Sequence, residues 1–554
     1  MTATRHEIRQ GAYYDSVVLM QLQRSLVQLE GVEDAGVVMA TQANREVLAA
    51  AGFTLEGVEA KPDDLLIVVR AAREEEALSA IGKVDELLKA RKTTTTSDFR
   101  PRSLESAAKA LPDANWLLVS VPGRYAASVA EEALDLGKHV FLYSDNVSME
   151  DEVKLKEKAS QQGLLVMGPD CGTAIINGAG LGFANRVRRG KVGLVGASGT
   201  GLQAITSGVH NLGGGVSQAI GTGGRDLKEV VGGTTALQAL ELLSRDPETE
   251  VIVLVSKPPS PSVASTLLSA ARATGKHVVV NFIGYPVSLE RVGNIHFATS
   301  LQNASRMAIS LLGTETVSLA APLKGYLRGL FSGGTLAYEA LQSLHAFLSP
   351  MFSNIPITPE QKLPDSMKSQ GHAILDLGED EFTQGRLHPM MDNDLRIRRM
   401  WQEAQDPDTG IIVLDVVLGE GAHPDPTSEL VPAIRQIKDK HPVEFAALVI
   451  GTPEDPQEMD NQISQLEQAG VTVFQEVAGL AEYLVSCLGA PYSYDGKPLD
   501  LAQFGDQFAA INVGLESFYD SLQSQGFETV QVDWRPPAGG KEDLMAILAK
   551  MKKG

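Results

Sequence analysis

The chain has 554 residues and a formal net charge of −21, from 69 acidic and 48 basic residues. A chain of this length should hold several domains, and its acidity argues against nucleic acid or a membrane surface as a partner. Two cysteines exclude a disulfide framework, and the sequence shows neither a signal peptide nor a membrane-spanning segment. We therefore expect a soluble cytoplasmic protein, and 53 glycines with 5% aromatic residues favour an α/β fold.

Residues 1–91 predict a small domain in which helices cover a sheet. Leucines recur at spacings of three and four between positions 19 and 29, as on an amphipathic helix. Strand-like segments complete a ferredoxin-like α+β domain, at residues 6–9, 35–39 and 64–70.

A linker with four consecutive threonines, residues 92–102, precedes the first doubly wound unit. From Trp116 short apolar strands alternate with helices, which predicts a parallel sheet with right-handed crossovers in residues 103–188. Ligands of such sheets bind beyond the carboxyl ends of the strands. Asp145 and Asp170 follow strands of this unit, so they are candidate acid or base groups, although helix caps and turn residues are commoner roles.

Residues 189–316 predict a second doubly wound unit. The segment VGLVGASGTG, at 192–201, passes from a strand through a small-residue loop into a helix, whose unpaired N–H groups make an anion site. Ser198, Gly199 and Thr200 are therefore candidates for binding phosphate. The loop lacks the lysine of a P-loop and the spacing of a dinucleotide fingerprint, so glycines that merely allow tight packing are the alternative.

Two further loops of this unit follow its strands. Gly223, Gly224 and Arg225 form a second glycine loop, and arginine is the side chain best shaped to bind phosphate or carboxylate. A surface pair of Arg225 with Asp226 is the alternative. Lys257 ends another strand, where it would either meet a phosphate or be solvated.

Residues 322–490 predict a third doubly wound unit, and residues 491–554 a C-terminal tail region. The candidates for a second phosphate cradle each follow a strand: they are Ser332, Gly333, Gly334, Gly419 and Gly421. His388 and His423 match no metal motif and each precedes a proline, so we expect loop roles and no metal site.

Several segments resemble succinyl-CoA synthetase. Residues 120–173 are similar to its α-subunit in a valine-proline strand end, a glycine-lysine turn and a GPNC-like loop, and KVGLVGASGTG and AIGTGGRD are similar to its KVGIVSRSGT and VGIGGD segments. Residues 373–392 and 411–426 resemble the C-terminal domain of its β-subunit. The resemblance implies a CoA-binding-like Rossmann domain, an α-like flavodoxin domain and a β C-terminal-like domain, at 103–188, 189–316 and 322–490.

Along nearly its whole length the chain resembles the FdrA family, including YYDSVVLM near the N-terminus and VDWRPPAGG near the C-terminus. That family is commonly labelled acyl-CoA synthetase, and members from allantoin-degrading bacteria are implicated as one subunit of oxamate carbamoyltransferase. Resemblance to those members implies phosphorolysis of oxalurate to oxamate and carbamoyl phosphate, in purine and allantoin degradation, together with partner protein subunits.

Departures from the ligase pattern decide between these labels. Residues 92–115 contain no glycine where the CoA-binding loop should lie, and no segment is long enough for an ATP-grasp fold. His296, in the stretch that matches the phosphohistidine loop, lies in a strand-like run and is expected to be structural. We therefore predict a carbamoyltransferase subunit that binds phosphate, carbamoyl phosphate and oxamate, with no catalytic residue assigned. No cofactor is certain, because the resemblance implies CoA whereas the sequence lacks the CoA-binding loop. The alternatives are an acyl-CoA synthetase of the succinate–CoA ligase kind and a non-catalytic scaffold subunit.

Overall fold

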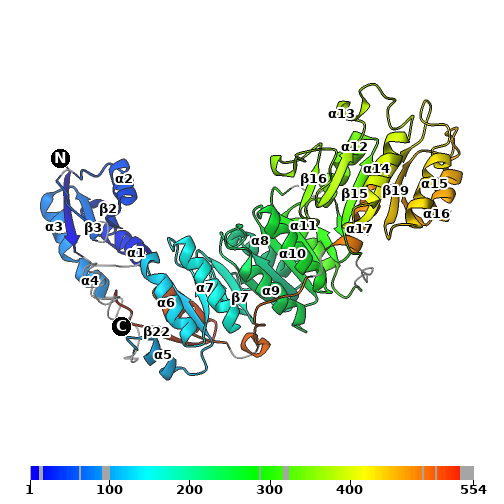
Figure 1. Ribbon diagram of the computed structural model, residues 1–554. Coiled ribbons are helices and arrows are strands. Elements are labelled where there is room, and N and C mark those ends of the chain that lie inside the picture. Colours follow the sequence, from blue (N-terminus) through cyan, green and yellow to red (C-terminus); the bar gives the residue numbers. More distant parts are fainter. Residues whose placement is uncertain are drawn as a thin grey trace, which may run out of the picture.

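The computed structural model describes residues 2–10, 16–55, 57–61, 64–89, 100–285, 289–315, 323–489, 492–505 and 508–536. These residues form four sheets, of three, five, eight and six strands in the order in which the chain enters them. Figure 1 shows the three-stranded sheet at one end of the molecule and the six-stranded sheet at the other, with the remaining two between them. No helix in the described ranges is long and apolar enough to cross a membrane. Most of the predicted linker at 92–102 lies outside the described residues.

The N-terminal sheet is antiparallel and carries helices on both faces. Its elements are β1 (Ala3–Arg9), α1 (Ser16–Val27), β2 (Val32–Met39), α2 (Gln42–Ala50), β3 (Leu65–Ala71), α3 (Glu74–Gly82) and α4 (Val84–Lys89). The strand order is β1-β3-β2, with three of the four strands of the ferredoxin-like pattern in the described part of the chain. The central strand β3 is apolar from Leu65 to Val69 because α1 and α3 cover the side of Leu65 and Ile67, and α2 covers the side of Leu66.

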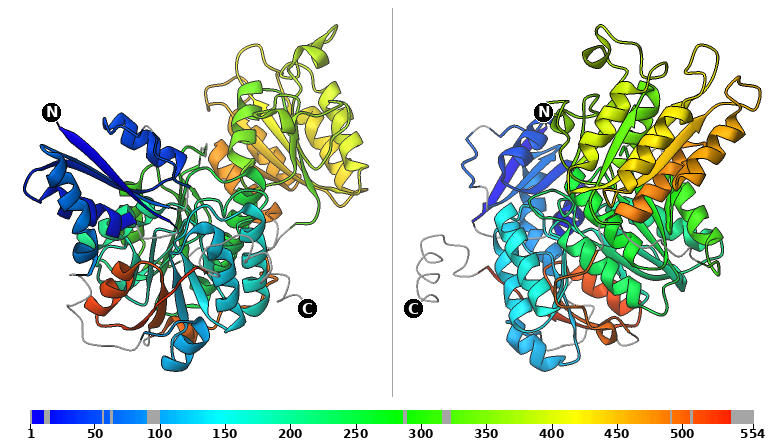
Figure 2. Two further views of the ribbon diagram at one scale, coloured as in Figure 1. Left: turned by 90° about the vertical axis from the view of Figure 1, so that its left-hand side faces the viewer. Right: turned by 45° about the vertical axis from the view of Figure 1, so that its right-hand side comes forward.

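The second sheet is parallel and takes strands from two distant parts of the chain. Its elements are α5 (Leu104–Ala110), β4 (Trp116–Val119), α6 (Gly123–Asp135), β5 (His139–Leu142), α7 (Met149–Gln162), β6 (Val166–Met167), η2 (Leu501–Phe504), β21 (Ala509–Val513), α18 (Glu516–Ser524) and β22 (Glu528–Val532). The strand order is β22-β21-β4-β5-β6, and Trp116 pairs with Ala510. Figure 2 shows the orange and red C-terminal elements beside the blue and cyan ones. Residues 509–532 are therefore part of this sheet rather than of a separate tail, and residues 537–554 lie outside the described part.

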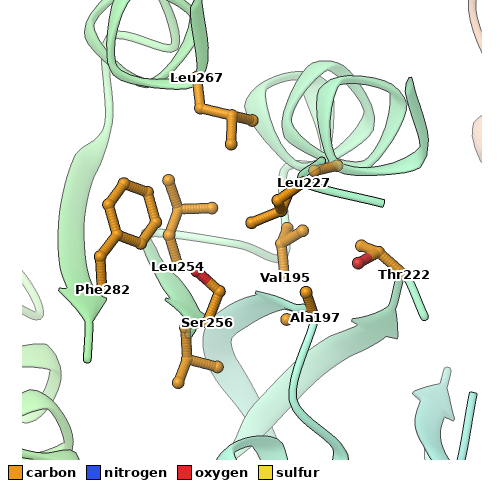
Figure 3. A pocket seen from close by; sticks show the side chains of 11 residues that line it. Val195, Ala197, Thr222, Leu227, Leu254, Ser256, Leu267 and Phe282 are labelled. Atoms are coloured by element: carbon orange, nitrogen blue, oxygen red, sulfur yellow. The ribbon is translucent and has the colours of Figure 1, made fainter. Parts of the chain in front are cut away.

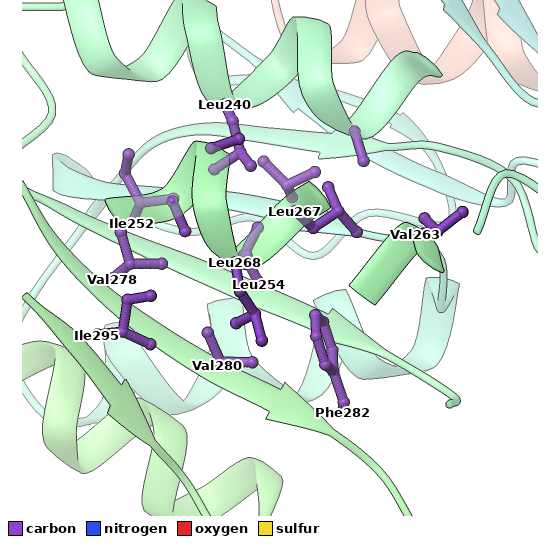
Figure 4. Close-up of a cluster of buried hydrophobic side chains, with 14 of the residues drawn as sticks. Leu240, Ile252, Leu254, Val263, Leu267, Leu268, Val278, Val280, Phe282 and Ile295 are labelled. Carbon is purple, nitrogen blue, oxygen red and sulfur yellow. The ribbon is translucent and has the colours of Figure 1, made fainter. Parts of the chain in front are cut away.

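The third sheet has a flavodoxin-like core. Its elements are β7 (Thr173–Ile176), β8 (Ala179–Gly182), β9 (Arg189–Gly196), α8 (Gly199–Asn211), β10 (Val216–Gly221), α9 (Thr234–Arg245), β11 (Val251–Ser256), α10 (Pro261–Ala273), β12 (His277–Phe282), β13 (Arg291–Val292), β14 (Ile295–Phe297) and α11 (Leu301–Ser310). The parallel strands run in the order β14-β12-β11-β9-β10, so the strand order reverses between β9 and β11, where such sheets bind ligands. α8 and α11 cover one face, and α9 and α10 cover the other, where the buried cluster of Figure 4 lies.

A hairpin of β7 and β8 extends the third sheet, and the sequence reading missed it. The two strands are antiparallel and join through Asn177 and Gly178, which both have positive φ angles. An Asn-Gly pair is the strongest short-range hairpin signal, so the sequence did carry this information.

The fourth sheet repeats the core of the third. Its elements are β15 (Tyr326–Phe331), α12 (Gly334–Leu344), β16 (Met351–Ser353), η1 (Pro359–Gln361), β17 (His372–Asp376), α13 (Asp380–Thr383), α14 (Asp394–Ala404), β18 (Thr409–Val417), α15 (Thr427–Lys438), β19 (Glu444–Ile450), α16 (Met459–Gln468), β20 (Val471–Phe474) and α17 (Val477–Leu488). The parallel order β16-β17-β15-β18-β19-β20 places the reversal between β15 and β18. The predicted α/β class with several doubly wound sheets is thus confirmed, while the predicted domain boundaries stay predictions.

Candidate functional site

The start of α8 presents backbone donors at the carboxyl end of β9. Ser198 caps the helix, and its Oγ accepts a hydrogen bond from Gly201 N at 3.1 Å. The amides of Gly199 and Thr200 have no acceptor within the described part of the chain, as expected for the first turn of a helix. Two free N–H groups at the positive end of a 13-residue helix are able to hold an anion.

Two other chain segments converge on this helix start. Thr173, which begins β7, places its Oγ1 3.5 Å from the point where a Cβ on Gly199 would lie. Its carbonyl packs so tightly on Gly221, at the end of β10, that a methyl group on that glycine would collide with it. The first residue of β7 and the last residue of β10 therefore form walls beside the predicted phosphate loop.

The second predicted loop packs against the five-stranded sheet instead of lining this space. Gly223 has φ +84°, and a side chain there would overlap the carbonyl of Pro169. A Cβ on Gly224 would lie 3.7 Å from Oδ2 of Asp170, which is an exposed residue with φ 57°. Gly223 is thus needed for the close approach of the two loops, whereas a Cβ at Gly224 would make only an ordinary contact.

Arg225 is held in a network of charges between α7 and the loop after β10. Its Nε lies 2.8 Å from Glu152 Oε2, and its Nη2 donates to the Val147 carbonyl at 2.9 Å. Lys156 Nζ lies 2.7 Å from Asp226 Oδ1 and 3.0 Å from Glu152 Oε1. Two buried carboxylates are thus balanced by two cations. The sequence predicted Arg225 either as an anion ligand or as a surface partner of Asp226. Neither prediction includes these contacts.

A small apolar crevice opens beside the predicted phosphate loop, between the sheet and the helices α9 and α10 (Figure 3). It lies where the strand order reverses, at the ends of β9 and β11. Ala197 lines the crevice and also directly precedes the Ser198 cap. The crevice and the helix start are therefore next to each other on the chain.

The second predicted cradle, at the start of α12, is already filled by a side chain. Asp415 of β18 accepts hydrogen bonds from Ser332 N and Gly333 N, each at 2.7 Å. Arg396 of α14 lies 2.9 Å from the same carboxylate, and both side chains are buried. Burial lowers the pKa of Arg396, and its ion pair with Asp415 opposes this shift. An external anion would have to displace Asp415 to use these amides.

A second carboxylate, Asp376, lies at the same edge of the fourth sheet. Its Oδ1 accepts a hydrogen bond from Gly378 N at 2.8 Å, and burial raises its pKa. A side chain on Gly334 would collide with its other oxygen, and His388 Nε2 lies 2.8 Å from where a Cβ on Gly378 would be. No group of three or more potential metal ligands occurs in the described ranges.

The remaining predicted residues lie in the loops that follow β18, β11 and β5. Gly419 exchanges two hydrogen bonds with the Gln457 side chain, and a Cβ on Gly419 or Gly421 would meet open space. Lys257 and Asp145 are exposed, and the carbonyl of Asp145 packs against Gly123.

The third and fourth sheets differ at one position that faces the helix start. In the third sheet, Val195 lies four residues before α8 and pairs with Leu254 of β11. In the fourth sheet, Leu330 lies four residues before α12 and pairs with Leu414 of β18. The residue that matches Asp415 is therefore Val255, whose Cγ2 would touch a Cβ on Gly201 of α8. The amides at the start of α12 donate to the Asp415 carboxylate, whereas the start of α8 faces the apolar side chain of Val255.

The residues that define these sites were mostly absent from the sequence interpretation. A lone carboxylate inside a buried apolar run, GIIVLDVVL, is the signal that identifies Asp415, because an isolated charge is otherwise excluded from a core strand. No comparable signal identified Glu152 and Lys156, since a Glu-Lys pair four residues apart usually lies on a solvated helix face.

Three family models match the chain. Residues 1–103 match the AllF, heavy metal-associated domain, residues 187–284 the CoA binding domain, and residues 330–483 CoA-ligase. The CoA binding match covers β9 to β12, whereas the sequence placed the CoA-binding-like domain at 103–188. The first name implies a metal, but residues 1–103 hold no cysteine and only one histidine, His6, so they do not fit a thiolate-bound metal.

Known proteins match the chain along most of its length or along part of it. The Escherichia coli (strain K12) protein named Uncharacterized protein YahF is 41% identical over 486 residues, which are 84% of this chain and 94% of YahF. The ADP-forming succinate–CoA ligase subunit alpha 2 of Archaeoglobus fulgidus is 32% identical over 149 residues, 26% of this chain and 50% of that subunit. A structure of the dinucleotide forming acetyl-coenzyme A synthetase 1 of Ca. Korarchaeum cryptofilum has 17% identity and a TM-score of 0.30, over 67% of this chain and 82% of that one.

The similarity to YahF extends over most of both chains, and CoA-ligase and CoA binding models match the two flavodoxin-like sheets. These matches confirm the expected FdrA and succinyl-CoA synthetase-like family, but they say nothing about carbamoyl transfer. The chain therefore belongs to the FdrA-like family of YahF, which is built from succinyl-CoA synthetase-like domains.

Proposed function

We propose that the chain is one subunit of a CoA-ligase-type enzyme that transfers an acyl group, and that the phosphate of an acyl phosphate binds at the start of α8. The comparisons support this reading more than the carbamoyltransferase predicted from the sequence, since one relative is named a succinate–CoA ligase subunit. The observation that carries the proposal is the difference between two helix starts. Asp415 fills that of α12, whereas Val255 leaves that of α8 without a carboxylate.

The free amides of α8 suit a phosphate group because the helix dipole and the N–H donors both favour an anion. Ser198 engages Gly201 N, so the available donors are those of Gly199 and Thr200. During acyl transfer the same donors stabilise the charge that the departing phosphate carries. These residues fit one phosphate group, and CoA, when bound, supplies the thiol that accepts the acyl group.

We expect a partner subunit to supply the nucleotide chemistry. The sequence has no segment long enough for an ATP-grasp fold. The matched relatives from Archaeoglobus fulgidus and Methylorubrum extorquens are themselves named as alpha subunits of ligases. The purified chain should therefore bind small anions but complete no ATP-driven ligation by itself.

Carbamoyl transfer between phosphate and oxamate is the second candidate, and the position of His296 favours it. This residue lies in β14 and is 8% exposed, with its Nε2 3.1 Å from Nδ1 of His277. Burial lowers its pKa to about 4. A histidine that is phosphorylated during catalysis needs a ring nitrogen that a phosphoryl donor can reach, whereas carbamoyl phosphate needs no such histidine. In this reading α8 binds the phosphate of carbamoyl phosphate.

Replacing Thr200 by Glu tests the anion site, and Thr335→Glu is its matched control. Both threonines are exposed and second in their helices, α8 and α12. A carboxylate there stabilises a helix by about 0.3–1 kcal/mol but repels an anion at the same helix start. We expect calorimetric titration with phosphate, acetyl phosphate, carbamoyl phosphate and CoA to show loss of phosphate binding in Thr200→Glu alone.

Two results would change the assignment. Equal phosphate affinity in Thr200→Glu and Thr335→Glu would exclude the start of α8 as the site. Binding of carbamoyl phosphate by the unmodified chain, without binding of acetyl phosphate or CoA, would favour the second candidate over the first.

A further inference from the structure

A hydroxyl group that no described residue engages lies beside the start of α8. Thr173, the first residue of β7, is 2% exposed, and its Oγ1 makes no hydrogen bond within the described part of the chain. This oxygen lies 3.5 Å from the point where a Cβ on Gly199 would be, so it faces the first residue of the helix. An unpaired hydroxyl at a buried position is unfavourable, and a ligand that accepts its hydrogen bond relieves this cost.

The backbone around Thr173 holds this hydroxyl in place. Thr173 pairs with Gly182 in the hairpin of β7 and β8, and Ile175 of the same strand pairs with Ala219 of β10. The tight contact between the Thr173 carbonyl and Gly221 fixes the start of β7 against the end of β10. These contacts engage the backbone of Thr173 and leave its side-chain oxygen positioned to donate to a ligand.

In the fourth sheet a carboxylate lies where the third sheet has this hydroxyl. Gly334 is the first residue of α12, as Gly199 is of α8. A Cβ on Gly334 would collide with Oδ2 of Asp376. A Cβ on Gly199 would instead make an ordinary contact with Thr173 Oγ1. Equivalent helix residues therefore face a carboxylate in one sheet and a hydroxyl in the other.

The pairing of the strands explains this exchange. Asp376 ends β17 and pairs with Phe331, whereas Gly221 ends β10 and pairs with Gly196. Phe331 and Gly196 each lie three residues before the helix that follows them. Gly221 thus has the position of Asp376 but carries no side chain, which leaves room for Thr173 to approach from the neighbouring strand.

The two helix starts consequently have opposite chemistry. Asp415 and Asp376 surround the start of α12 with hydrogen-bond acceptors, which repel an anion. At the start of α8 the matching residues are Val255 and Gly221, so neither supplies a carboxylate. The polar groups that replace them there are backbone amides and the hydroxyl of Thr173, all of which donate hydrogen bonds.

We propose that Thr173 Oγ1 donates a third hydrogen bond to the phosphate group at the start of α8, beside the amides of Gly199 and Thr200. This inference rests on the proposed function, which places the phosphate there. The helix supplies two donors from one side, and β7 supplies the third from another, so a tetrahedral anion is held through more than one of its oxygens. The hairpin of β7 and β8 thereby contributes directly to the binding site.

Thr173→Val tests the proposal, because valine keeps the shape of threonine and removes only the hydroxyl. Thr206→Val is the matched control, since Thr206 is also buried, lies within α8, and donates to the Leu202 carbonyl at 2.8 Å. Calorimetric titration of the full chain would use inorganic phosphate and acetyl phosphate. We expect Thr173→Val to bind both about tenfold more weakly, and Thr206→Val to bind them as the unmodified chain does. Thr173→Ser keeps the hydroxyl and should retain most of the affinity.

Thermal unfolding without phosphate separates ligand binding from a structural role. Because Thr173→Val removes a hydroxyl that no described residue engages, its Tm should equal or exceed that of the unmodified chain. A variant that is no less stable but binds phosphate more weakly identifies Oγ1 as a donor to the ligand. A clearly lower Tm would mean that the hydroxyl stabilises the fold itself, and would overturn the proposal.

The titrations also separate this inference from the proposed function. If the unmodified chain binds neither inorganic phosphate nor acetyl phosphate, the proposed function fails and this inference fails with it. If phosphate binds and Thr200→Glu abolishes the binding, but Thr173→Val keeps full affinity, the anion site stands and only the role of Thr173 is refuted.

Discussion

Lys156 of α7 places its Nζ 2.7 Å from Oδ1 of Asp226, in the loop that follows β10. The pair is buried and joins the five-stranded sheet to the loops of the eight-stranded sheet. Lys156 also donates to the Thr222 carbonyl at 3.0 Å, while Asp226 accepts from two amides in the first turn of α9, those of Thr235 and Ala236. One lysine thus fixes a loop beside the candidate anion site to a helix of the neighbouring sheet.

Removal of this lysine should destabilise the protein strongly. In Lys156→Met the carboxylates of Glu152 and Asp226 lose a buried counter-charge, which typically costs about 3–5 kcal/mol. Lys154→Met is the control, because Lys154 lies on the same helix in an exposed pair with Glu150, and exposed ion pairs contribute little to stability. Differential scanning fluorimetry should show a large fall in Tm for the first variant and almost none for the second. Equal Tm values would mean that the network contributes no net stability.

The filled helix start of the fourth sheet should become an anion site when its carboxylate is removed. Asp415→Ala leaves Arg396 buried without a partner and frees the amides of Ser332 and Gly333, so we expect a loss of about 3–5 kcal/mol. Phosphate in place of the missing carboxylate should restore part of this loss. Thermal unfolding at low and high phosphate, at constant ionic strength, measures the effect.

The control for this experiment is Asp394→Ala, which removes an exposed aspartate of α14 that pairs with Arg398. Its Tm should respond to phosphate as that of the unmodified chain does. A phosphate response of Asp415→Ala no larger than that of Asp394→Ala would show that the freed amides do not bind the anion.

Acid should weaken the five-stranded sheet through His139. This side chain stacks on Trp116, accepts a hydrogen bond from Leu165 N, and is fully buried, which lowers its pKa to about 4. In the unfolded chain His139 takes up a proton as the pH falls below 6.5, whereas in the folded chain it does so only near pH 4. The free energy of unfolding therefore falls between these two pH values. The expected loss by pH 5 is about 2 kcal/mol.

Urea unfolding at pH 7 and pH 5 tests this expectation. The loss on acidification should be about 2 kcal/mol smaller in His139→Gln than in the unmodified chain. His6→Gln, at an exposed position of β1, should leave the loss unchanged. An identical pH dependence in all three proteins would falsify the assignment to His139.

A single methyl group should show how tightly the walls of the candidate site pack. In Gly221→Ala the new Cβ collides with the Thr173 carbonyl and with Cys171 Sγ, so we expect a loss of about 1–3 kcal/mol. Gly82→Ala is the control, since its Cβ would meet open space at the end of α3 and the change should stabilise by up to about 1 kcal/mol. Comparison of the two Tm values measures the contact, and shifts of the same sign would argue against it.

Local patterns were sufficient to predict most strands of the parallel sheets. The buried runs that became β9, β11 and β12 are continuous apolar segments followed by glycine or polar turns, and such segments report their own structure. No local pattern near Ala510 predicted which strand β21 pairs with. Pairing with β4 depends on contacts nearly the length of the chain away, which no local pattern records.

The candidate site was predictable only in part, because a helix start reveals its donors but not what occupies them. Ser198 and Ser332 begin loops of the same kind, and both were predicted to bind phosphate. Their environments differ through Val255 and Asp415, which lie more than fifty residues further along the chain. The role of Arg225 was hidden for the same reason, since its partner Glu152 lies on another sheet's helix.

The pairing of β4 with β21 has a consequence for synthesis of the protein. A hydrogen bond beside this pairing joins residues 393 positions apart, from Ser120 to Val513. At translation rates of about 5–20 residues per second, β4 waits roughly 20–80 s for its neighbour. During that interval the nascent chain exposes an apolar strand edge to other chains on the ribosome, which is the situation that chaperones relieve.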